Sequence, residues 1–156
     1  MHLTADIRSF LAAPVTIILG TRGEGFTPDI SRGMGLSVLP DAETIDIMVS
    51  RWQWPMAVAN LQANGALAMT VSAPQTYQTY QFKGQATVHP ASEADIALAA
   101  RYARRMLDVF AEFNMTAAYS GNWMSLRDLM VARLTVAEIF IQTPGPQAGQ
   151  MAGAAQ

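Results

Sequence analysis

The sequence contains no cysteine and only two histidines, His2 and His89. Thiol catalysis, iron–sulfur clusters and thiolate zinc sites are therefore excluded, and two imidazoles cannot build a histidine-rich metal centre. Lysine is almost absent as well, because Lys83 is the only one beside nine arginines. Arginine suits planar, two-pronged contacts with phosphate or carboxylate, although a GC-rich genome produces the same bias.

Charge is also scarce. Charged residues make up 14% of the chain and hydrophobic residues 51%, and the formal net charge is −2. This composition offers no clustered positive charge for nucleic acid or an acidic membrane. The apolar run from Phe10 to Gly20 is interrupted by Pro14, has no basic leader and is too short to span a bilayer. These two observations lead us to expect a cytoplasmic protein that binds a small molecule. Because so apolar a composition favours a buried subunit interface, we also expect a homodimer.

A chain of 156 residues is long enough for about one domain with one core. Short segments between turn signals predict six strands: 15–19, 29–39, 44–50, 66–72, 78–88 and 131–141. Helices are predicted at 5–12, at 56–64 between Pro55 and Gly65, and after Pro90, where Ser92 and Asp95 have capping-box spacing. We therefore expect a mainly β, α+β fold: a six-stranded antiparallel split β-barrel with flanking helices, over residues 1–146. Residues 147–156 are predicted to form a flexible tail.

Two arginines stand out in the predicted strands. By alternation, Arg32 shares a face with Ile30, Met34, Leu36 and Val38, so we expect it among apolar side chains. A guanidinium in that position meets an anionic ligand, pairs with Asp29 or Asp46, or reaches out to water. Gly33 and Gly35 beside it permit either a bend in the barrel or the close approach of a flat ligand.

The second arginine, Arg51, lies in Ser50-Arg51-Trp52-Gln53, just before the helix that Pro55 opens. A hydroxyl, a guanidinium and the free amides of a helix N-terminus suit a phosphate monoester, and an exposed loop with a capping serine is the alternative. In the 78–88 strand, Thr79, Gln81, Lys83 and Gln85 share one polar face. That face either contacts a heterocycle or is the solvent side of an ordinary strand.

In their order and spacing, the segments SRWQWPMAVANLQANGALAMTVS, TYQTYQFKG and FIQTPGP resemble the pyridoxamine 5′-phosphate oxidase-like, FMN-binding split-barrel family. The resemblance covers roughly residues 11–149 and implies a dimer with two flavin sites in its interface. It places Ser31, Arg32 and Gly33 along the isoalloxazine, Ser50 and Arg51 at the phosphate with Gln53 close by, and Thr79 and Gln81 against the flavin. Many members carry a phosphate-binding lysine where this chain has Ala57 or Val58.

No phosphate loop, GxGxxG fingerprint or GxSxG elbow is present, so redox or group-transfer chemistry would have to come from a bound cofactor. We therefore expect an FMN-dependent oxidoreductase that acts on a small organic substrate, without a metal site and with no catalytic residue identified. Arg32 and Lys83 are the candidates for stabilising a reduced, anionic flavin. The alternative is a non-catalytic split barrel that carries or senses flavin, F420 or haem.

Overall fold

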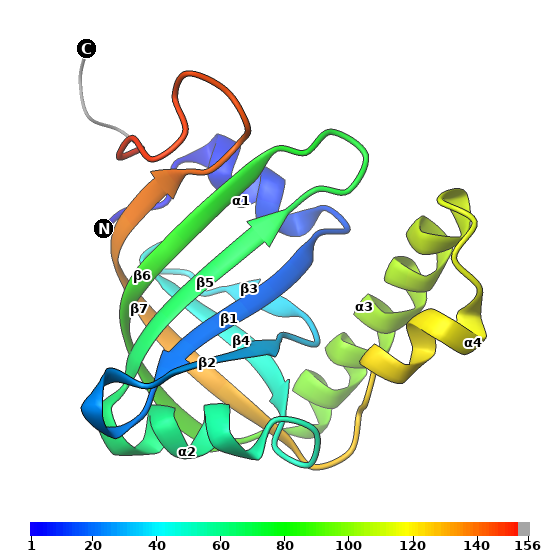
Figure 1. The fold of residues 1–156 in the computed structure, drawn as a ribbon, viewed down its shortest axis with the longest axis horizontal. Helices are drawn as coiled ribbons and strands as arrows, with labels where there is room; N and C mark the ends of the chain where they lie inside the picture. Colours follow the sequence, from blue (N-terminus) through cyan, green and yellow to red (C-terminus); the bar gives the residue numbers. More distant parts are fainter. Residues whose placement is uncertain (153–156) are drawn as a thin grey trace.

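The computed structural model describes residues 1–152 and contains one curled antiparallel sheet with four α-helices (Figure 1). The strands are β1 (Thr16–Arg22), β2 (Pro28–Arg32), β3 (Leu36–Val38), β4 (Thr44–Ser50), β5 (Ala66–Ser72), β6 (Thr79–Pro90) and β7 (Leu129–Ile141). The helices are α1 (Ala5–Ala12), α2 (Pro55–Asn64), α3 (Glu93–Glu112) and α4 (Ala117–Ser120). Two single 3₁₀ turns, η1 (Glu24–Phe26) and η2 (Gly121–Trp123), complete the order.

The strands follow the order β2-β1-β5-β6-β7-β4-β3 in one sheet, so consecutive strands β2 and β3 lie at its two opposite edges. The chain crosses between these edges at Gly33 and Met34. The Gly33 amide donates to Ile17 O of β1 at 3.1 Å, and the Met34 amide donates to Met48 O of β4 at 2.7 Å. The predicted α+β, antiparallel split barrel is therefore confirmed, but the sheet has seven strands and is not closed. One predicted strand, 29–39, is divided where it changes partners.

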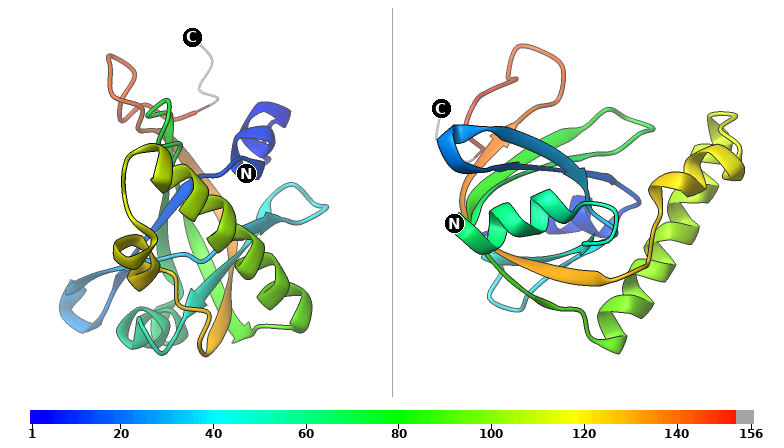
Figure 2. Two further views of the ribbon diagram at one scale, coloured as in Figure 1. Left: turned by 90° about the vertical axis from the view of Figure 1, so that its right-hand side faces the viewer. Right: turned by 60° about the horizontal axis from the view of Figure 1, so that its bottom comes forward.

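Alternating apolar side chains fill the interior of the curled sheet. Helix α2 lies across the lower end of the barrel and α1 lies at the upper end (Figures 1 and 2). Pro55 begins α2, and Gly65 ends it in the left-handed conformation with φ of 67°, as the sequence predicts. The largest fully buried residues of this core are Leu3, Ile17, Leu19, Ile45, Ile47, Met69, Phe82, Leu134 and Ile139.

Helix α3 covers only part of the outer surface of the sheet. Its capping box is formed, because the Ser92 hydroxyl accepts from the Asp95 amide and the Asp95 carboxylate accepts from the Ser92 amide. A second apolar cluster joins the helix to β4 and β7 through Met34, Met48, Ala99, Leu129 and Val131. The helix is the long arm that lies beside the barrel in Figure 2. None of the helices in residues 1–152 is long and apolar enough to cross a membrane.

The chain after β7 turns back on that strand. The Gly149 amide donates to Ile141 O at 2.8 Å, the Ile141 amide donates to Gln150 O at 2.9 Å, and the Ala152 amide donates to Ile139 O at 2.7 Å. Ala152 is 8% exposed and packs against the barrel core. The sequence predicts a flexible tail over 147–156, of which residues 153–156 lie outside the described residues.

The crossing at Gly33 leaves no room for a side chain. A Cβ atom on Gly33 would lie 2.6 Å from Ile17 Cγ2 and 3.0 Å from Ile47 Cγ2, because the crossing residue sits between the two sheet edges. We expect Gly33→Ala to destabilise the protein by about 1–3 kcal/mol, the usual cost of overpacking a core. The measurement is the free energy of unfolding in urea.

Gly121→Ala serves as the control, because a Cβ atom at Gly121 meets nothing within 4 Å. Equal stabilities of the two variants would show that the crossing tolerates a side chain.

Candidate functional site

One face of the sheet is not covered by any helix of the described chain. In Figure 1, β1, β5 and β6 lie in front and no helix crosses them. The alternation of each strand decides which side chains occupy this outer face: Ile17 and Leu19 point into the core, while Ile18 between them points outward. We call this surface, formed by β2, β1, β5, β6 and the end of β7, the open face.

Pairing across the strands aligns side chains into rows on the open face. The register pairs Arg32 with Ile18, Ile18 with Thr70, Thr70 with Gln81 and Gln81 with Phe140. These residues form one continuous row from β2 to β7. The neighbouring rows contain Lys83 with Ala68 and Gly20 on one side, and Thr79 with Ser72 and Thr16 on the other.

The polar groups of the open face are partly bonded to each other. The Gln81 Nε2 group donates to Thr70 Oγ1 at 3.2 Å, and the Ser72 and Thr79 hydroxyls lie 2.8 Å apart. The Lys83 ammonium lies 4.5 Å from the ring centre of Phe140. The row of Lys83, Ala68 and Gly20 lines a shallow groove of about 630 Å³, together with Ala66, Gly84 and Ala137. Small residues make this part of the surface flat.

The prediction that Arg32 lies on the same face as Met34 is wrong. Ser31 is buried at 1% exposed, whereas Ile30 is 69% exposed and Arg32 is half-buried on the open face. The expectation that Arg32 shares a face with Met34 fails because the chain changes partner strands at Gly33 and Gly35, the latter with φ of 119°. This irregularity interrupts the alternation, so Met34 is buried although Ile30 is not.

Arg32 has an aromatic partner and no acidic one. Its guanidinium lies 4.6 Å from the ring centre of Trp123 in η2, a distance at which a cation is attracted to the ring. Neither proposed carboxylate pairs with it. Asp46 instead accepts two hydrogen bonds of 2.8 Å from Arg133. Within residues 1–152, Arg32 forms no salt bridge, so its charge is available to a ligand.

Beside the open face, the segment 121–128 contacts the residues at and just after the end of β4. Ser50 Oγ donates to Arg127 O at 2.7 Å, and Gln53 Nε2 donates to Asn122 O at 3.0 Å. The Arg127 guanidinium lies 4.8 Å from the ring centre of Trp52. We call these residues, together with Arg51, Trp123 and Asp128, the arginine–tryptophan cluster. Arg32 joins this cluster to the open face through Trp123.

Arg51 is paired with a carboxylate. Its Nε and Nη2 groups donate to the two oxygens of Asp128 at 2.8 and 2.9 Å. The two side chains are 49% and 40% exposed. The hydrogen bond and the charge of the partner raise the pKa of Arg51 and lower that of Asp128. Arg51 is therefore not the unpaired cation that its sequence position suggests, and an anion would have to share it with Asp128 or displace Asp128.

Several buried polar atoms near the cluster have no partner. Gln53 Oε1 and Trp54 Nε1 form no hydrogen bond, and no side chain caps the N-terminus of α2. Ser31 Oγ is also buried without a partner, on the interior side of β2. Buried polar atoms are normally hydrogen-bonded, so water or a further bound group can satisfy these atoms.

The structure thus brings most of the sequence-predicted residues into two adjoining places. The open face contains Arg32, Thr79, Gln81 and Lys83, and the cluster contains Ser50, Arg51 and Gln53. The other two lie elsewhere: the Ser31 side chain points into the barrel, and Gly33 lies at the crossing. Sequence reasoning missed Asn122, Trp123, Arg127 and Asp128. The segment that carries them has no regular periodicity, and its only signal is the aromatic and charged residues themselves. No group of three or more acidic or histidine residues within 1–152 is arranged to hold a metal ion.

Solved structures with this fold are known, although no protein-family model matches the chain and no curated protein matches its sequence. A Lactobacillus delbrueckii protein named "putative pyridoxamine 5′-phosphate oxidase" aligns with a TM-score of 0.56 at 14% identity, over 89% of this chain and 93% of the other. An F420 reductase aligns with a TM-score of 0.55 at 18% identity, over 85% of this chain and 94% of the other. For HutZ, a haem storage protein from Vibrio cholerae, the TM-score is 0.53 at 19% identity, over 90% of this chain and 95% of the other. These neighbours share the pyridoxamine 5′-phosphate oxidase-like split-barrel fold with this chain, and at such identities the likeness establishes the fold alone.

The Arg51–Asp128 pair predicts a small pH dependence of stability. Because the folded pKa of Asp128 lies below its ordinary value of 3.8, the pair stabilises the protein above that pH and loses its effect as the pH falls through the lowered value. We expect Asp128→Asn to lower the urea midpoint slightly at pH 7, since the pair is exposed, and this difference from the unmodified protein to shrink as the pH falls below 3.8.

Asp108→Asn is the control, because Asp108 is exposed on α3 and forms no salt bridge within residues 1–152. A difference between Asp128→Asn and the unmodified protein that is as large at pH 3 as at pH 7 would contradict this assignment.

Proposed function

We propose that the protein is an FMN-dependent oxidoreductase that acts on a small organic substrate, with FMN held against the open face at the interface of a homodimer. The observation that carries the proposal is the row from Arg32 to Gln81, which presents an unpaired guanidinium, a hydroxyl and an amide on a sheet surface that the described chain leaves uncovered. A surface of this kind can bind a planar, hydrogen-bonding ring that gains negative charge on reduction.

The open face fits the ring of a flavin. Gly20, Ala66 and Ala68 leave a flat area, and Gln81 and Thr70 provide amide and hydroxyl groups beside it. Bound FMN would supply the transfer of a hydride or of electrons. Arg32 and Lys83 supply positive charge near this area, which stabilises an anionic reduced ring. The aromatic partners Trp123 and Phe140 hold these two cations in place.

The groups near the predicted FMN phosphate position are mostly engaged already. Ser50 and Arg51 are already bonded to the segment 121–128, and Arg51 is neutralised by Asp128. The uncapped N-terminus of α2 and the free guanidinium of Arg32 remain as groups that attract an anion. We infer that a phosphate binds between them, with Arg51 contributing if it shares its charge between Asp128 and the phosphate.

The homodimer accounts for the open face. Its rows include the apolar side chains Ile18 and Phe140, and Ile30 beside them is 69% exposed. Exposed apolar side chains on a sheet face stabilise the protein when another surface covers them. We therefore propose that a second copy of the chain packs there and closes the flavin site.

A non-catalytic carrier or sensor of flavin, F420 or haem is the second candidate. The haem storage protein among the structural neighbours supports a carrier, and the F420 reductase supports F420 as another cofactor for this fold. One observation bears on haem: His89 Nε2 is buried and has no hydrogen-bond partner. However, His89 is paired with Val131, which packs with Ala99 of α3. A haem ligated by His89 would thus lie under α3 and away from the open face.

Titration of the purified protein with FMN, F420 and haem tests the proposal. We expect FMN to bind, and bound FMN to bleach on addition of a reduced nicotinamide. Arg32→Gln should weaken FMN binding by about 1.5–3 kcal/mol, which is about ten- to a hundredfold in Kd, because a charged hydrogen-bond donor is lost. Arg104→Gln, which changes an exposed arginine on α3 outside both places, should leave the Kd unchanged.

Three results of the titration would change the assignment. FMN that binds without bleaching favours the carrier, preferential binding of F420 or haem replaces the cofactor, and a protein that binds none of the three overturns both candidates. Asp128→Asn adds a test of the phosphate end, since it frees Arg51. Tighter FMN binding would support Arg51 as a ligand, whereas unchanged binding would show that the phosphate lies elsewhere.

The dimer is tested by a charge on the open face. We expect the protein to sediment as a dimer and Ile30→Glu to sediment as a monomer, because an ionised carboxylate in a buried interface is unfavourable. Ile96→Glu is the matched control, since Ile96 is 43% exposed on α3 and should tolerate the charge without dissociation. If the unmodified chain is a monomer at all concentrations, the interface proposal is wrong.

A further inference from the structure

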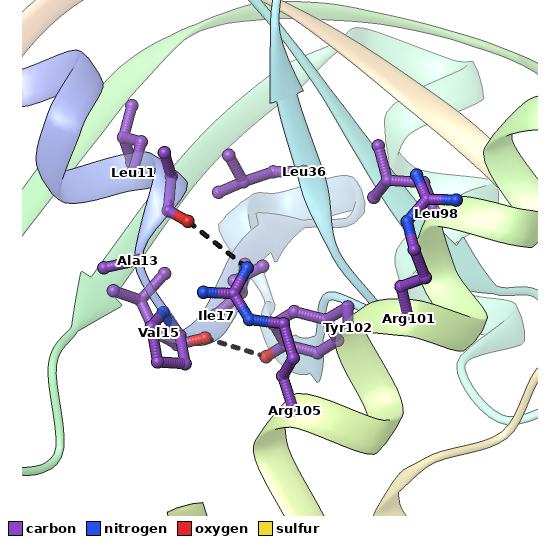
Figure 3. Close-up of a pocket in the computed structure, with 11 residues that line it drawn as sticks. Leu11, Ala13, Val15, Ile17, Leu36, Leu98, Arg101, Tyr102 and Arg105 are labelled. Carbon is purple, nitrogen blue, oxygen red and sulfur yellow. Dashed lines mark hydrogen bonds between the residues drawn. The ribbon is translucent and has the colours of Figure 1, made fainter.

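A separate pocket opens at the junction of α1, β1, β3 and α3 (Figure 3). Its volume is about 260 Å³, which is just below the range for sites that hold drug-sized molecules. A pocket of this size has room only for a small molecule. Apolar residues from all four elements line it: Leu36 and Leu98 are partly exposed, together with Pro14, whereas Leu11, Val15 and Ile17 are at most 3% exposed.

The polar groups of the pocket wall are already bonded to each other. The Tyr102 hydroxyl donates to Val15 O at 2.9 Å, and burial raises the pKa of this hydroxyl far above its ordinary value. Arg105 Nη1 donates to Ala12 O, the carbonyl at the end of α1, at 3.4 Å. Figure 3 shows both bonds as links from α3 to the segment that enters β1. Tyr102 and the two carbonyls are thus structural.

Two guanidinium groups at the rim have spare donors. Arg101 forms no hydrogen bond or salt bridge with any residue of 1–152, and Arg105 has only the long bond to Ala12 O. Both arginines are exposed on the same side of α3, one helical turn apart. In the part of the chain that the structure describes, no carboxylate neutralises either of them.

We propose that this pocket binds a small carboxylate with an apolar body, such as an aromatic or short branched acid. The apolar body packs against Pro14, Leu36 and Leu98. The carboxylate is held at the rim by Arg101 and Arg105. Guanidinium groups bind carboxylates in a planar, two-pronged geometry. An anion without an apolar part leaves the inner surface in contact with water, so the site selects against it.

The pocket is distinct from the open face. Ile17 and Leu36 reach it from the core side of the sheet, whereas Arg32 and Gln81 lie on the outer side. Tyr102 lines the pocket and bonds to Val15 O just before β1. The carboxylate site does not depend on whether the open face binds FMN.

Calorimetric titration with benzoate tests the site on the unmodified protein. We expect one benzoate per chain, with benzamide and acetate each binding at least about tenfold more weakly, because benzamide lacks the charge and acetate lacks the apolar body. If benzamide binds as well as benzoate, the arginines play no part. If acetate binds as well, the contact is a surface ion pair. Either result, or the absence of benzoate binding, overturns the proposal.

Variants locate the binding. The double substitution Arg101→Gln with Arg105→Gln should weaken benzoate binding at least about tenfold. Arg104→Gln on the same helix and Arg32→Gln on the open face should leave it unchanged, since neither residue lines the pocket. A loss on Arg32→Gln would place the benzoate on the proposed flavin surface instead. If the double variant still binds benzoate as tightly, and unfolds at the same urea concentration as the unmodified protein, the assignment is also overturned.

Discussion

The structure depends on how the chain moves from one edge of the sheet to the other. At Gly33 and Met34, consecutive residues bond to Ile17 on β1 and to Met48 on β4, which lie far apart in the strand order. The crossing curls the sheet so that one side forms a closed core. It also fixes the outward position of Arg32, since β2 ends at this residue. Gly33 therefore both allows the barrel to form and positions Arg32, the main candidate for binding an anionic group.

The outer side of the curled sheet is divided into two parts. Helix α3 packs over β4 and β7 through Met48 and Val131, and the remaining strands keep an open face. Because the segment 121–128 runs from α4 back to β7, it passes the boundary between the two parts. It there meets Arg32 through Trp123 and Arg51 through Asp128. The open face lies on one side of this boundary, and α3, which carries Arg101, Tyr102 and Arg105 of the pocket, lies on the other.

Local signals predict much of the fold. Pro55, Gly65 and the pair Ser92 and Asp95 mark helix ends correctly, since capping and left-handed stops depend on neighbouring residues only. Alternation along the 78–88 strand also identifies Thr79, Gln81 and Lys83 as one face. It fails for Arg32 because a change of partner strands is not visible in a single strand.

The contacts of Arg51 could not be predicted for a related reason. Its partner Asp128 is 77 positions away in the sequence, in a segment without periodicity. Either residue alone is compatible with solvent, a ligand or an ion pair, and only the packing of β4 beside β7 joins them. Seven strands replace the predicted six for the same kind of cause, since the division of 29–39 depends on contacts with Ile17 and Met48.

The return of the chain after β7 has a consequence for solubility. Strand β4 pairs with β7 only up to Thr135, so the backbone of β7 from Val136 onward has one side without a neighbouring strand. Gln150 and Ala152 bond to that side at Ile141 and Ile139. An unpaired edge of this length would be a template for strand addition between molecules. The last described residues thus act as a cap that protects the sheet from aggregation.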